Sequence, residues 1–230
     1  MYYFDWTYIV FVVPAMIIAM WAQYKVTSTF KKYSTVYTDR RITGREAAMK
    51  ILVANGLTGV RVERVSGHLT DHFDPKTNVI RLSDSVYDSS SVASVGVAAH
   101  EAGHAVQYAV GYSPMKLRAA IIPITNIGSV AAVPLVIAGL VFSFYTLAYA
   151  GIVLFGAVVL FQLVTLPVEF NASRRAITAL RDSGYFTEEE LHGSKKVLSA
   201  AAMTYLAALF AALGNMLRLI FIVSGRRGRK

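Results

Sequence analysis

The sequence predicts a mainly α integral membrane protein, with about four transmembrane or membrane-associated helices and a small α+β domain that contains a short β-hairpin. Of the 230 residues, 55% are hydrophobic and only 16% are charged, a composition typical of membrane proteins. The apolar residues gather into runs that reach the roughly 20 residues needed to cross a bilayer core. Stretches of soluble composition separate these runs.

The first apolar run predicts an N-terminal transmembrane anchor over residues 1–23. It lacks a basic segment ahead of it and a clear small-residue cleavage motif before Tyr24. We therefore expect a retained helix and not a cleaved signal peptide.

Residues 24–118 have soluble composition and predict a membrane-proximal α+β domain. Thr43 and Gly56 bracket a helical pattern as cap and stop. The alternating residues 59–65 and the extended residues 79–82, separated by turn chemistry, favour a hairpin. Ser89, Ser90 and Ser91 offer N-caps to a second helix, which is expected over about residues 92–111. The stretch "NVIRLS" (78–83) is interpreted as an edge strand that could accept a substrate backbone.

The remaining chain alternates again between apolar and polar segments. Residues 119–166 predict a transmembrane hairpin that turns near residues 143–150. A helical segment over 167–199 is expected to begin at Pro167 and to restart at Thr187 with Glu190 in a capping box. Residues 200–224 predict a last membrane helix, although Asn215 and Arg218 weaken it, and residues 225–230 form a basic tail.

A metal site is indicated by "HEAGH", which places His100, Glu101 and His104 in the pattern H-E-x-x-H. Residues four apart lie on one helix face, so both imidazoles can reach one ion, while Glu101 can take a proton from the attacking water. In a chain of this composition the pattern arises by chance roughly three times in a thousand. With no cysteine present, nitrogen and oxygen ligands favour one zinc ion per chain.

A catalytic zinc site needs a third protein ligand, and no histidine follows His104 closely. We select Glu169, because a membrane hairpin between His104 and Glu169 would return the chain to the same membrane face. A carboxylate favoured by the helix dipole is the alternative explanation of Glu169. The other candidates are His68, Asp71, His72, Asp74, His192 and the carboxylates after Pro167.

The order of these motifs along the chain is similar to that of a known group of membrane proteases. "HEAGH", an uncharged hairpin and "EFNASRRA" (169–176) resemble the membrane-embedded gluzincins that include HtpX and the CAAX prenyl proteases. With "HLTDHFDP" (68–75) ahead of the motif, nearly the whole chain is similar to the smaller YugP-like neutral zinc metallopeptidases of bacterial membranes. The resemblance implies a gluzincin-like domain with zinc held by His100, His104 and Glu169, and Glu101 as general base and acid.

The chain departs from the HtpX pattern at Ser173, where an aspartate would orient a ligating histidine. Asn171, Asp71 or a backbone carbonyl are alternatives for that part. Possible donors to the oxyanion of the reaction are His68, His72, Arg174 and Arg175.

The expected function is a membrane-bound zinc metalloendopeptidase acting on membrane-associated or misfolded proteins and peptides. The alternative is a zinc-binding membrane protein without protease activity, such as a scaffold, adaptor or transporter. The net charge of +9 comes from cations that flank apolar segments, so we expect a lipid bilayer and no nucleic acid as partner. The excess of cations in residues 24–118 predicts a zinc site on the cytoplasmic face of a bacterial cell membrane.

Overall fold

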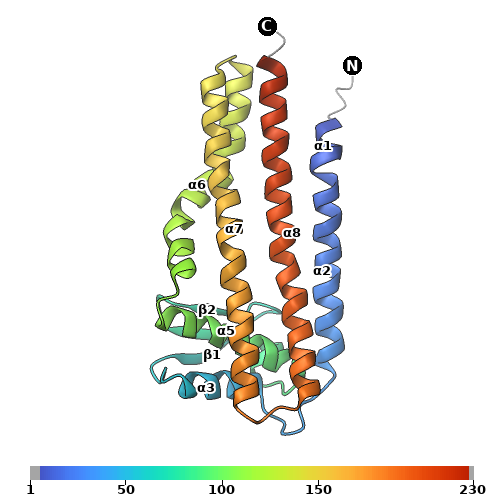
Figure 1. Cartoon of the computed structure of the whole chain (residues 1–230), viewed down its shortest axis with the longest axis vertical. Coiled ribbons are helices and arrows are strands. Elements are labelled where there is room, and N and C mark those ends of the chain that lie inside the picture. The colour runs from blue at the N-terminus through green and yellow to red at the C-terminus, as the bar shows by residue number, and fades with distance from the viewer. Residues whose placement is uncertain (1–5, 228–230) are drawn as a thin grey trace. The chain divides into compact units, whose positions relative to one another are not determined.

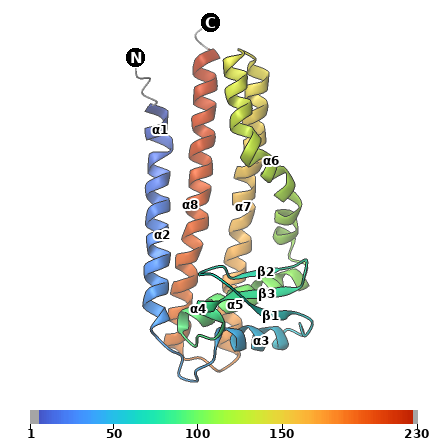
Figure 2. The ribbon, with the colours of Figure 1, turned by 180° about the vertical axis from the view of Figure 1, so that it is seen from behind.

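The computed structural model describes residues 6–227 and divides into two compact units (Figures 1 and 2). Among these residues, the helical unit comprises 6–23, 116–166 and 204–227, and the mixed unit comprises 24–115 and 167–203. The start of the predicted anchor, residues 1–5, and the end of the predicted basic tail, residues 228–230, lie outside the described residues.

Five helices supply the helical unit. They are α1 (Trp6–Phe11), α2 (Val13–Ser34), α6 (Ser113–Val141), α7 (Tyr145–Asp182) and α8 (Glu188–Arg227). All of these except α1 also contribute residues to the mixed unit. Within residues 6–227, four stretches are long and apolar enough to cross a membrane: Trp6–Ser34, Ser113–Val141, Tyr145–Asp182 and Glu188–Gly225. The predicted fold class, a mainly α membrane protein with a small α+β part, is confirmed.

Small residues bring the helices of this unit close together. A side chain added at Gly151 of α7 would meet the carbonyl oxygen of Ala132 in α6 at 2.7 Å, so α6 and α7 touch through their backbones there. Gly214 of α8 packs in the same manner against the carbonyl of Phe11. Such contacts are typical of helices that associate by close packing in lipid.

The mixed unit combines parts of the long helices with a small sheet (Figure 2). Its own elements are α3 (Gly44–Ala54), α4 (Asp84–Tyr87) and α5 (Val92–Ala109), with β1 (Arg61–Val65), β2 (His72–Asp74) and β3 (Val79–Ser83). The predicted caps are present: Thr43 and Glu46 form a capping box at α3, and the Ser91 side chain accepts from the Ser94 amide at α5. Both predicted helices are therefore confirmed.

The sheet has three strands in the order β1-β3-β2. β2 and β3 form an antiparallel hairpin. The predicted hairpin between residues 59–65 and 79–82 was wrong, because β1 and β3 pair in parallel. The prediction of an edge strand at residues 78–83 was wrong, because β3 is the central strand. The reason is visible in its burial: Val79, Ile80 and Leu82 are fully buried, and residues buried on both faces are typical of a strand with neighbours.

The prediction that a helix begins at Pro167 was also wrong. α7 runs without interruption from Tyr145 to Asp182 with Pro167 inside it, which places Glu169 in mid-helix. The helix-dipole explanation of Glu169 therefore does not apply, since that effect is confined to the first turn. α8 likewise joins the two predicted segments 188–199 and 200–224 in one helix. Asn215 is tolerated there because its side-chain amide donates to the Ala211 carbonyl at 3.0 Å.

Candidate metal site

α5 is the buried helix of the mixed unit. Ala98, Ala99 and Ala102 are fully buried in the apolar core of that unit. Gly103 allows α7 to approach, because a side chain at this position would lie 2.6 Å from the carbonyl oxygen of Ala172. The small residues around the H-E-x-x-H motif therefore hold α5 directly against the segment of α7 that carries Glu169.

The side chains of His100, His104 and Glu169 meet between these two helices. Glu169 Oε2 lies 3.2 Å from His100 Nε2 and 3.5 Å from His104 Nε2. One possible ligand atom from each of the three residues falls within 4.8 Å of the others. Only 14%, 11% and 4% of the three side chains are exposed, in the order given. Among residues 6–227 this is the group of three that could hold a metal ion.

This donor set fits zinc. With zinc–ligand bonds of about 2.0–2.2 Å, two ligand atoms of a tetrahedron lie about 3.3–3.6 Å apart. The two measured distances from Glu169 Oε2 to the imidazoles agree with that separation within a tenth of an ångström. Two imidazole nitrogens and one carboxylate oxygen are also among the ligand sets that catalytic zinc uses.

Each histidine is oriented through its other ring nitrogen. The Ser173 hydroxyl lies 3.1 Å from His100 Nδ1, and Gln107 Oε1 lies 3.0 Å from His104 Nδ1. Since an amide oxygen only accepts, the neutral form of His104 carries its proton on Nδ1 and has its lone pair on Nε2. Ser173 therefore occupies the orienting position at which the sequence departs from the HtpX pattern.

Gln107 is a residue that sequence reasoning missed. It is fully buried, and its amide nitrogen donates to the Val168 carbonyl at 2.8 Å and to Asn171 Oδ1 at 3.0 Å. Arg175 Nε donates to the same Asn171 oxygen at 2.8 Å. The available signal was a single amide side chain in an otherwise apolar run, three residues after His104 and hence on the same helix face.

Glu101 lies on the same turn as His100 and is 8% exposed. Burial of the His104 imidazole lowers its pKa, but the hydrogen bond with Glu169 and the charges of Glu101 and Glu169 outweigh this, so the pKa lies above its usual value. The two carboxylates thus give the site a negative electrostatic potential. An environment that stabilises an added proton on an imidazole also stabilises a cation bound between the same groups.

The other predicted ligand candidates have different partners. Asp71 accepts hydrogen bonds from the backbone and hydroxyl of Ser83, and burial raises the pKa of this carboxyl. Asp74 is ion-paired with Arg81 at 3.2 Å. The ring of His72 lies 2.8 Å from the Thr70 carbonyl, and His68 packs edge-on against Phe30. His192 is exposed on α8.

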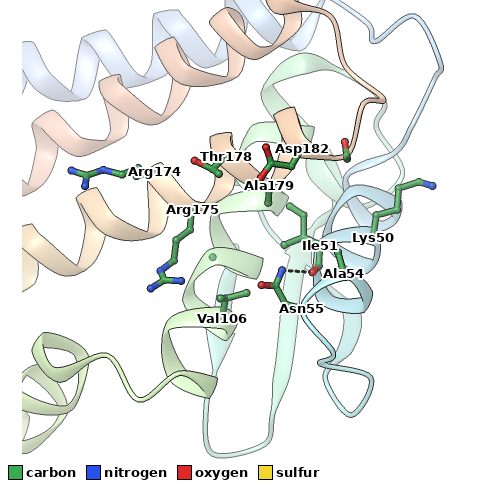
Figure 3. Close-up of a pocket in the computed structure, with 12 residues that line it drawn as sticks. Lys50, Ile51, Ala54, Asn55, Val106, Arg174, Arg175, Thr178, Ala179 and Asp182 are labelled. Carbon is green, nitrogen blue, oxygen red and sulfur yellow. Dashed lines mark hydrogen bonds between the residues drawn. The ribbon is translucent and has the colours of Figure 1, made fainter.

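The two arginines considered as oxyanion donors border a hollow of about 440 Å³ between α3, α5 and α7 (Figure 3). Arg175 is held by Asn171, as described above, and Arg174 points in the opposite direction from Lys50 (Figure 3). Asp182 and Asn55 also line this hollow. The role of oxyanion donor for His68, His72, Arg174 or Arg175 stays a prediction.

The comparisons with known proteins show the family of the chain. A family model described as "Putative neutral zinc metallopeptidase" matches residues 8–224. The chain belongs to this family. It is also 45% identical over 220 residues to the "Putative membrane protease YugP" of Bacillus subtilis, an alignment that covers 95% of this chain and 98% of that relative. No solved structure matches the chain. The YugP-like resemblance is confirmed, and the family supports a zinc-dependent protease role at a membrane.

Proposed function

We propose that this member of the family is a membrane-bound zinc metalloendopeptidase that hydrolyses peptide bonds in membrane-associated or misfolded proteins. The observation that carries the proposal is the convergence of His100, His104 and Glu169 at zinc-ligand spacing, with Glu101 on the same turn of α5. These three residues would hold one zinc ion per chain. Zinc bound there would supply a Lewis acid that polarises the scissile carbonyl and lowers the pKa of water.

Glu101 is the proposed general base and acid. Its carboxylate accepts a proton from the attacking water as the oxygen bonds to the scissile carbonyl carbon. The same proton then passes to the amide nitrogen as the carbon–nitrogen bond breaks, which releases a neutral amine. Ser173 and Gln107 keep the two imidazoles in the orientation that presents Nε2 to the metal.

The proposed location is the cytoplasmic membrane of a bacterium, with the zinc site on the cytoplasmic side. The support is the excess of Lys and Arg over Asp and Glu in residues 24–118, together with four candidate membrane spans. The lipid bilayer and a peptide or protein substrate are the expected partners.

The test is Glu101→Gln in the full-length protein, assayed on an unstructured protein substrate beside the wild type. We expect zinc content to stay the same and cleavage to fall by at least about 100-fold, the lower range for loss of general acid–base catalysis. Equal cleavage by both proteins would exclude Glu101 as the base. Stoichiometric zinc without cleavage in the wild type would favour the alternative, a zinc-binding scaffold, adaptor or transporter.

A further inference from the structure

A groove of about 520 Å³ lies between α7 and α8 within the mixed unit. Each helix contributes one face to it, with residues spaced three or four apart. The lining residues are Phe170, Ser173, Arg174, Ile177, Thr178 and Arg181 of α7, and Lys195, Leu198, Ser199, Ala202 and Met203 of α8. The floor is apolar, since Leu198 and Ala202 are buried and Ile177 is half-buried.

The charged side chains that line the groove are all basic. Three cations line it, and none of its lining residues is acidic. Arg181 is ion-paired with Glu188 at 3.3 Å, but neither Arg174 nor Lys195 has an ion-pair partner among the residues that the structure describes. The groove therefore offers two exposed positive charges over an apolar floor, a combination that is complementary to an anionic amphiphile.

Charge and apolar surface are also ordered along the groove. α7 and α8 are consecutive antiparallel helices joined by residues 183–187, so Arg181 lies near the joining turn and Phe170 and Met203 lie at the far end. From Phe170 and Met203 each helix continues in sequence into its apolar membrane segment. Phe170 is 43% exposed, so a large part of this apolar residue is not covered by the described chain.

The groove is built from helices alone, which bears on what could occupy it. The backbone amides of α7 and α8 are engaged within their own helices, so an extended peptide would find no main-chain partners there. Recognition must rest on charge and apolar contact. We propose that this groove binds one anionic phospholipid, with its phosphate at Arg174 and Lys195 and its acyl chains over Phe170, Ala202 and Met203.

The occupant would touch the metal site indirectly. Ser173 lines the groove, and its hydroxyl lies 3.1 Å from Nδ1 of His100. A lipid in the groove therefore contacts the residue that orients one proposed zinc ligand, on the ring side opposite to Nε2. A bound lipid could therefore influence the site through Ser173.

The experiment is a calorimetric titration of the full-length protein in detergent with dioctanoyl-phosphatidylglycerol. In the Arg174→Gln/Lys195→Gln double variant we expect binding to weaken about 25-fold, because each cation near an anionic lipid contributes about a fivefold preference. Lys196→Gln is the matched control, since Lys196 is exposed on α8 and does not line the groove. It should bind as the wild type does. A bulky Ser199→Phe variant should also lose binding by filling the groove.

Further arms separate the possible occupants. Dioctanoyl-phosphatidylcholine should bind far more weakly than the anionic lipid, and glycerol phosphate, which lacks acyl chains, should not compete. Equal binding of the two lipids, equal binding by the double variant, or full competition by glycerol phosphate would each overturn the proposal. So would an acidic peptide that requires the same two cations and displaces the lipid completely. Because no arm measures hydrolysis, the result is independent of the proposed protease activity.

Discussion

The two histidines of α5 stand one helical turn apart and are held in different ways. His104 is hydrogen-bonded to Gln107, a fully buried amide whose nitrogen donates to two further acceptors. His100 is bonded to Ser173, a half-buried hydroxyl. An amide with both ends engaged cannot turn, whereas a hydroxyl rotates freely and can either donate or accept. The comparison indicates a rigid ligand at His104 and an adaptable one at His100.

The largest effect is expected at Glu169, the residue that contacts both imidazoles. Its carboxylate contacts both imidazoles, so Glu169→Ala removes one proposed ligand and leaves the two histidines without their shared partner. We expect zinc affinity to fall by more than about 100-fold, beyond the roughly 10–100-fold range for losing a partner of a ligand. Zinc retained on dialysis against a graded chelator, measured by atomic absorption, is the readout.

Glu189→Ala is the control for that experiment, because Glu189 is exposed in the first turn of α8 and outside the cluster. It should retain zinc as the wild type does. Unchanged zinc binding by Glu169→Ala would remove Glu169 from the ligand set and return the search to Asp71, His68 and His72.

An intermediate effect is expected on the rigid side. Gln107→Leu removes the acceptor of His104 Nδ1 and the donor to the Val168 carbonyl. Zinc affinity should fall roughly 10–100-fold, and the free energy of unfolding should fall by about 1–3 kcal/mol because the three hydrogen bonds of the buried Gln107 amide are lost. Chelator competition and denaturant unfolding in detergent measure the two effects.

Gln107→Glu separates these two contributions. The carboxylate still accepts from His104 Nδ1 but cannot donate to Val168, so zinc should be retained better than in Gln107→Leu while stability is lost in both. If Gln107→Leu bound zinc normally, the rigid side of the comparison would be wrong and Gln107 would be a packing residue.

The sequence predicted those parts of the molecule that depend on local patterns. The start of α5 followed from its serine cap, and the H-E-x-x-H spacing alone put His100 and His104 on one face. Glu169 required a non-local step, the return of the chain through an uncharged hairpin. The structure places its carboxylate beside both imidazoles, and its role as a ligand stays a prediction.

Other features depend on contacts that local patterns do not encode. β3 looked like an edge strand because its second partner, β2, lies in the stretch that was read as turn chemistry. Its other partner, β1, pairs in parallel with Arg61 opposite Val79, and not as one arm of a hairpin. α7 passes through Pro167 because a helix packed among other helices tolerates a missing amide. Gln107 went unrecognised because its three partners come from α5 itself and from a segment of α7 about sixty residues away.

The smallest effect is expected on the adaptable side, at Ser173. Ser173→Ala removes one hydroxyl from a half-buried position, where water can replace it, so zinc affinity should fall by no more than about tenfold, the lower end of the usual range. Ser199→Ala is the control, since the Ser199 hydroxyl lines the α7–α8 groove without contacting a histidine, and it should leave zinc affinity unchanged.

Ser173→Asp sharpens the comparison, because a carboxylate would accept a charge-assisted hydrogen bond from His100 Nδ1 and fix the ring as firmly as Gln107 fixes His104. Zinc affinity should then rise above that of the wild type. A loss of affinity in Ser173→Asp larger than that in Ser173→Ala would mean that the hydroxyl serves His100 as a donor, with the proton of the imidazole placed on Nε2, and would contradict the proposal that Nε2 of His100 faces the metal.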